Sequence, residues 1–197
     1  MTQGRKVRST AFGTQRALRA LALQTEKELD LNLRPLLIGL VAGQRSMTPL
    51  AAVALAARSG GLARDNGAPP IIGRRASAVA ASALAIGEML GDKMRSAPDR
   101  TIPPGLAARL FAGGIAGAAL APRSSRASAA ALGATGAILG GYAGLALRKR
   151  AMRRFGQTRS GLAEDLLTLA ATTLILRERP KRQTPSVQLE GVNPPPA

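Results

Sequence analysis

Apolar residues gather in five segments of this chain, and polar or turn-forming stretches separate them. The fourth segment, 127–147, has 21 residues and no charge. That length suits a helix crossing a hydrocarbon core, whereas a soluble surface helix would carry charges along one face. The pattern predicts an all-α fold, an integral membrane helical bundle of about four to five apolar segments. The five segments are 36–57, 76–91, 105–121, 127–147 and 166–176.

The hydropathy pattern also divides the chain into three parts. Residues 1–35 are basic and polar, and we interpret them as a cytosolic tail or an interfacial helix. Residues 36–176 form the predicted membrane domain. Residues 177–197 lack an apolar period and end in a proline-rich run, which is typical of disorder.

Some segments fit a membrane less well than the fourth. Residues 76–91 would reach roughly 24 Å as a helix, which is short for a core of about 30 Å. Residues 166–176 are also short unless the preceding Glu164 and Asp165 lie within the membrane. Alanine is near neutral for insertion, so a soluble alanine-rich helical bundle is the alternative fold.

The first segment contains a permanent charge near its middle and two helix-breaking residues. Arg45 lies between Gly43 and Pro49. This arrangement predicts a broken or re-entrant helix whose second half begins near Ser46 or Thr48, with one of the two as N-cap and the proline in the first turn.

Charge and composition narrow the possible functions. The net charge is +17 and aromatic residues make up only 2% of the chain, with no Trp. A basic protein suits an anionic partner, either a membrane surface or nucleic acid. The near absence of aromatics removes stacking platforms and disfavours nucleic acid.

Catalytic chemistry has little support in the sequence. The chain has no histidine and no cysteine, which excludes histidine-based triads and Cys/His zinc sites. The acidic pair Glu88 and Asp92 defines no reaction without a nucleophile and base or a metal set. We therefore expect no enzyme, no metal and no cofactor.

Glycines recur four residues apart in three segments, which lets helix backbones approach closely. The simplest interpretation is packing within the bundle, and a homo-oligomer through one of these faces is the alternative. The glycines are Gly87, Gly91, Gly113, Gly117, Gly136, Gly140 and Gly144.

Polar residues in or beside the apolar segments suggest an intramembrane network. A charge at membrane depth is costly and normally pairs with an opposite charge inside the bundle. We expect Arg45 and Arg109 to be compensated by Glu88, Asp92 and Glu164 or Asp165. The alternative is that Glu88 and Asp92 mark the membrane edge, while Glu164 and Asp165 complement a helix N-terminus. The candidates are Arg45, Ser46, Thr48, Glu88, Asp92, Arg109, Glu164 and Asp165.

A basic cluster follows the fourth segment directly, where it would meet anionic lipid headgroups. With five spans and the amino terminus inside, this cluster lies on the cytoplasmic side, as the positive-inside rule favours. If residues 36–57 enter and leave on one side, the remaining topology inverts. The expected headgroup-binding residues are Arg148, Lys149, Arg150, Arg153 and Arg154.

Four stretches of the chain together resemble a known family. They are GLVAGQRSMTPLAAVALAAR (39–58), GEMLGDKMRSAPDRTIPPGLAAR (87–109), GAILGGYAGLALRKRAMRRFG (136–156) and LAEDLLTLA (162–170). The chain is similar over 36–176 to small bacterial multi-pass membrane proteins that carry a domain of unknown function. The resemblance implies a bacterial inner-membrane protein and brings no established activity. Members often carry a histidine where Ala146 and Leu147 stand here.

Two functions fit these features. The first is a small transporter- or channel-like protein, in which the broken helix and the charged residues line a solute or ion site. The alternative is a non-transporting structural membrane protein. It would organise lipids or partner proteins through its glycine faces and basic cluster.

Overall fold

The part of the chain that the computed structural model describes, residues 3–91 and 103–177, is mostly helical. The all-α class predicted from the sequence is confirmed, and no β-strand occurs within these ranges. The elements are α1 (Gln3–Gln44), α2 (Met47–Ser59), the 3₁₀ turn η1 (Pro70–Gly73), α3 (Arg75–Gly91), α4 (Pro103–Ala119), the 3₁₀ turn η2 (Arg123–Ser125), α5 (Arg126–Phe155) and α6 (Gln157–Arg177). Asp92 falls outside the described residues.

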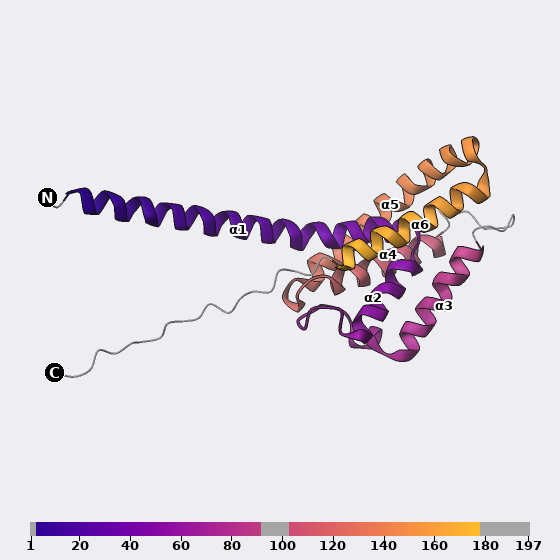
Figure 1. Ribbon diagram of the computed structural model, residues 1–197. Helices are drawn as coiled ribbons and strands as arrows, with labels where there is room; N and C mark the ends of the chain where they lie inside the picture. The colour runs from indigo at the N-terminus through magenta and orange to yellow at the C-terminus, as the bar shows by residue number, and fades with distance from the viewer. Residues whose placement is uncertain (1–2, 92–102, 178–197) are drawn as a thin grey trace.

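Helix α1 has two parts with different surroundings. Its amino-terminal part projects from the bundle as a single helix, and only its last turns enter the bundle (Figure 1). The helix continues through Pro35, which is buried. The boundary expected between a tail and a membrane domain at residue 36 therefore lies inside one continuous helix.

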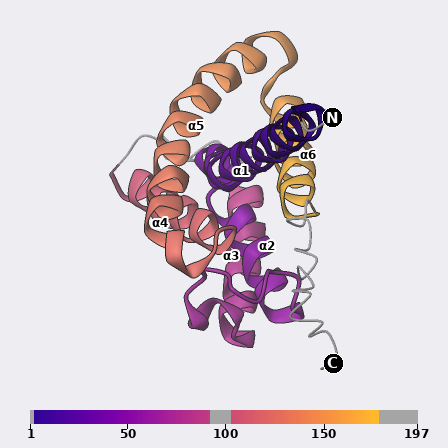
Figure 2. The same cartoon turned by 90° about the vertical axis from the view of Figure 1, so that its left-hand side faces the viewer.

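The remaining helices surround the carboxyl-terminal part of α1. Seen end-on, α5 and α4 lie on one side of α1, α6 lies on the other, and α2 and α3 lie below it (Figure 2). The most extensive contacts join α1 to α5 and α4 to α5, and the next, equally extensive, join α1 to α4 and α2 to α3.

Glycine brings α1 and α5 into backbone contact. A Cβ added at Gly140 would overlap the carbonyl group of Leu40, and one at Gly136 would overlap the backbone at Leu36. At Gly144 the added Cβ would lie 3.2 Å from the side chain of Gln44. These three positions repeat every four residues, so one face of α5 lies directly against α1.

A second face of α5, which includes Gly133, packs against the glycines of α4. A Cβ at Gly117 would lie 2.5 Å from the carbonyl oxygen of Ala129, and one at Gly113 would lie 2.7 Å from that of Gly133. Gly133 also excludes a side chain at Gly39 of α1. Three helices therefore meet at Gly133, and neither Gly39 nor Gly133 was among the glycines predicted to pack.

Alanines line the contact between α2 and α3. The buried side chains are Ala51 and Ala54 of α2 with Ala78, Ala81 and Ala85 of α3.

The glycines of α3 do not share in this contact. A Cβ added at Gly87 or Gly91 would meet no described atom within 4 Å. The expectation that these two glycines pack helices together is not met within the described residues, because the alanine face of α3 is the one that meets α2.

Many large apolar side chains lie on the outside of the molecule, and several polar ones lie inside. Leu90 and Leu174 are each 63% exposed, whereas Arg45 is 1% exposed and Thr172 is 2% exposed. Soluble proteins show the opposite distribution, because burying large apolar side chains is what stabilises them.

Among the described residues, one helical stretch is long and apolar enough to cross a membrane by length and composition. It is Arg123–Phe155, which consists of η2 and α5. A single such helix is weak evidence for membrane association.

Candidate functional site

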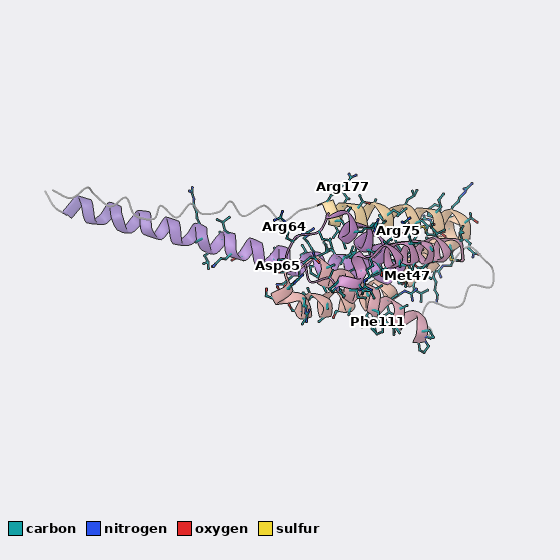
Figure 3. The ribbon with its side chains drawn as sticks, turned by 90° about the horizontal axis from the view of Figure 1, so that it is seen from below. Met47, Arg64, Asp65, Arg75, Phe111 and Arg177 are labelled. Carbon is teal, nitrogen blue, oxygen red and sulfur yellow. The ribbon has the colours of Figure 1, made fainter. Side chains whose placement is uncertain are left out.

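The break that the sequence predicts in the first apolar segment lies at Arg45 and Ser46, between the end of α1 at Gln44 and the beginning of α2 at Met47. The amide of Arg45 still donates to the carbonyl oxygen of Val41 at 3.0 Å, so the α1 ladder extends to this residue. Pro49 has no N–H to offer the carbonyl of Arg45, and its ring would clash with that carbonyl in a continuous helix. The chain therefore turns here, and α2 begins at Met47, inside the bundle (Figure 3).

Glu88 of α3 caps the beginning of α2. Its Oε1 accepts hydrogen bonds from the amide and the hydroxyl of Ser46, both at 3.1 Å, and its Oε2 accepts one from the amide of Met47 at 3.0 Å. A carboxylate at this place satisfies exposed backbone N–H groups and opposes the positive end of the helix dipole. Ser46 precedes α2 in sequence, but its side chain caps nothing in its own helix.

Arg45 makes the complementary contact with the backbone of α3. Its Nη1 donates to the backbone carbonyl oxygen of Glu88 at 3.2 Å, in the last described turn of that helix. Its Nη2 lies 2.5 Å from Oδ1 of Asp165, on α6. The guanidinium thus joins two helices to the break.

We call Arg45, Ser46, Met47, Glu88 and Asp165 the helix-terminus junction. The end of α1, the beginning of α2 and the last described turn of α3 meet at it. The break leaves backbone groups at the end of α1 and the beginning of α2 without intrahelical partners, which is costly where water is absent. Glu88 accepts from the amides at the beginning of α2 and Arg45 donates to the backbone of α3, so the break is stabilised from within the protein.

The two consecutive acids of α6 have different partners. Asp165 pairs with Arg45, while Oε2 of Glu164 lies 3.0 Å from Nη1 of Arg148 on α5. Neighbouring residues on a helix point about 100° apart, which explains the division. The sequence predicted compensation of the arginines by acids, but the carboxylate of Glu88 serves backbone amides instead.

The basic residues at the end of α5 also differ in their surroundings, because one is held inside the protein and four are exposed. The side chain of Arg148 is 10% exposed and held by Glu164, so it differs from the other expected headgroup-binding residues. Lys149, Arg150, Arg153 and Arg154 are exposed. Four of the five predicted cations therefore remain available to an anionic surface.

Helix α6 has a buried polar stripe, of which the sequence analysis singled out only Asp165. Ser160, Asp165, Thr168 and Thr172 are buried along one side, and leucines such as Leu166 are exposed on the other. The spacing of three to five residues was a usable signal, but the apolar segment 166–176 was drawn around the leucines and began after Glu164 and Asp165. The helix begins nine residues earlier, at Gln157.

The remaining predicted residues lie around the junction. Thr48 is buried in the first turn of α2. Arg109 is buried on α4, and its Cδ would lie 3.7 Å from a Cβ on Gly141 of α5. A further buried arginine, Arg34, was not predicted, and its Nη2 donates to the carbonyl oxygen of Ile175 at 2.8 Å.

Comparison with known proteins gives no relatives. No family model, no curated protein and no solved structure matches this chain. Within the described ranges, no group of three or more acidic side chains is arranged to hold a metal ion.

Proposed function

We propose that this chain is a multi-pass membrane protein of structural role, in which the helix-terminus junction holds a re-entrant hairpin in place. The observation that carries the proposal is the inverted distribution of side chains. Arginine, aspartate and threonine are buried, and leucine is exposed on α3, α5 and α6. Lipid is the solvent in which such a surface is stable. The family resemblance, as a prediction, would place the protein in a bacterial inner membrane.

The path of α1 and α2 supports a re-entrant hairpin. Gln44 lies against Gly144, well along α5. The chain then returns through α2, and Gly67 donates its amide to the carbonyl oxygen of Ala121, just before α5 begins. Residues 36–59 thus enter and leave at one end of the bundle.

The junction supports a structural role because its charges are occupied by protein. Both oxygens of Glu88 accept hydrogen bonds from residues of the break, and Arg45 is held by Asp165 and by a helix carbonyl. A solute would have to displace these contacts, and removing one partner of a buried ion pair is strongly unfavourable.

Fractionation tests the membrane location. We expect the full-length protein to stay in the membrane pellet after washes with high salt and with alkaline carbonate, and to be released by detergent. Release by the high-salt wash would indicate a protein bound only by charge. Recovery in the supernatant without detergent would contradict the proposal.

The absence of cysteine allows a direct test of the hairpin. Single variants Ser59→Cys, Ser124→Cys and Thr158→Cys place a thiol at exposed positions at the end of α2, before α5 and at the start of α6. With a membrane-impermeant maleimide, we expect the first two to react from the same side and the third from the opposite side. Labelling of Ser59→Cys and Ser124→Cys from opposite sides would contradict the re-entrant path.

A transporter- or channel-like function is the second candidate, and one observation favours it. The hydroxyl oxygens of Thr48 and Thr172 are buried, on the neighbouring helices α2 and α6, with no hydrogen-bond partner among the described residues. Buried polar groups are normally paired with protein or ordered water. A polar solute or ion between these helices would supply the partner.

Proteoliposomes separate the two candidates. Chloride efflux and proton uptake would be measured for the wild type, for Thr172→Val and for the exposed neighbour control Thr173→Val. The structural proposal predicts no flux above protein-free vesicles in any of them. Flux that Thr172→Val lowers at least tenfold, and Thr173→Val leaves unchanged, would establish the second candidate instead.

A further inference from the structure

A shallow apolar groove runs along the outside of α2 and α3. Leu55 of α2 and Val79 and Ile86 of α3 line it, and each of these side chains is more than half exposed. Ala78 lies buried between the two helices. No described helix covers the groove, so these side chains face the surroundings of the bundle.

Two arginines close one end of the groove. Arg58 lies in the last turn of α2 and Arg75 begins α3, and both line the groove. The two helices are antiparallel neighbours joined by residues 60–74, so both guanidinium groups reach the same end. Both are exposed, and neither forms an ion pair with an acidic side chain of the described residues.

We infer that this groove binds one anionic phospholipid, with the phosphate between Arg58 and Arg75 and an acyl chain along Leu55, Val79 and Ile86. Guanidinium groups match phosphate oxygens in charge and in geometry. From Arg75 to Ile86 the helix rises roughly 16 Å, which is about half of a 30 Å hydrocarbon core. The groove therefore has the polarity and the length of one lipid in one leaflet.

This site differs from the basic cluster in place and in kind. Residues of the loop that follows α2 pack beside the start of α5, where the amide of Arg123 donates to the carbonyl oxygen of Asp65 at 3.2 Å. The exposed cations Lys149, Arg150, Arg153 and Arg154 lie at the other end of α5. They form a diffuse charged surface, whereas the groove combines two arginines with an apolar channel.

The inference rests on the proposed membrane location. If fractionation places the protein in the supernatant, the proposed membrane function is contradicted whatever the groove binds. Lipid binding to the purified chain tests the groove separately.

Native mass spectrometry in a neutral detergent provides the test, with dioleoylphosphatidylglycerol and dioleoylphosphatidylcholine as probes. We expect wild-type protein to retain the anionic lipid preferentially. Arg58→Gln with Arg75→Gln should weaken that binding about 30-fold. The matched control, Arg153→Gln with Arg154→Gln, removes the same charge at the other end and should change it less than threefold.

A second variant tests the apolar part of the groove without altering charge. Ala83 is exposed and lines the groove, so Ala83→Trp should fill it and lower lipid retention to the level of the double arginine variant. Inorganic phosphate and glycerol phosphate should compete only at concentrations far above that of the lipid.

Four results would overturn the inference. Equal loss in the control pair would indicate diffuse attraction, and equal binding of the zwitterionic lipid would remove the role of charge. Competition by inorganic phosphate at the lipid's own concentration would indicate a free anion as ligand. A dimer that Ala83→Trp abolishes would identify a second copy of the chain as the occupant.

Discussion

The α1–α5 contact and the helix-terminus junction hold helices together by different physical means. At the first, Gly136 and Gly140 bring two backbones into contact over several turns. At the second, a few charged side chains occupy the ends of helices. The first contact depends on the absence of side chains, and the second on particular ones.

The two regions therefore tolerate change differently. A glycine contact has no atom that can move aside, so any added side chain forces the helices apart. A polar junction can lose a matched pair of charges together, because what is costly in an apolar interior is one charge left alone. The following changes test this difference.

Gly140→Leu should have the largest effect. Its Cβ would overlap the backbone of Leu40, and the backbone cannot give way as a side chain does. The cost should exceed the ~1–3 kcal/mol typical of overpacking. We expect no folded protein after detergent extraction, as measured by size-exclusion chromatography. The control Gly87→Leu adds the same side chain where space is open and should yield folded protein.

Asp165→Leu should follow, because it leaves the guanidinium of Arg45 buried without its carboxylate. Removing one partner of a buried pair costs about 3–5 kcal/mol. Arg45→Met with Asp165→Leu should recover much of that loss, measured as the midpoint of unfolding by SDS in mixed micelles. A double variant as unstable as the sum of the single ones would show that the pair is not coupled.

Glu88→Gln should have a smaller effect. The amide keeps one oxygen acceptor for the start of α2 but loses the charge that opposes the helix dipole. We expect a loss of about 1–2 kcal/mol in the same unfolding measurement. Asp65→Asn, an exposed carboxylate outside any ion pair between described residues, is the control and should be neutral.

Gly87→Ala should have the smallest effect, and of opposite sign. The site is open, and alanine favours a helix over glycine by up to about 1 kcal/mol. We expect unfolding to shift to slightly higher SDS. Clear destabilisation would instead mean that Gly87 contacts another molecule, as the oligomer alternative predicts.

The sequence predicted the helices better than their partners. Apolar segments and the Arg45–Pro49 pattern located the helices and the break, because these depend on local chemistry. Glycine spacing located the contacts of α5 with α1 and α4. The same spacing in α3 marks an open face, since spacing identifies a face but not what lies against it.

The pairing of charges could not be read from the sequence. Glu88 and Asp165 are both acids beside apolar segments, yet one accepts backbone amides and the other pairs with a guanidinium. This choice depends on where α3 and α6 end up relative to the break. The serine and threonines of the α6 stripe were missed because they carry no charge, and the sequence alone does not show which face of a helix is turned inward.

The position of Asp165 also has a consequence during synthesis. The chain makes Arg45 early and Asp165 late, because α6 is the last described helix. A nascent chain that has not yet reached α6 has no Asp165 carboxylate to hold the guanidinium of its hairpin. The ion pair that fixes the break can therefore form only after α6 has been synthesised, when the other described helices have already been made.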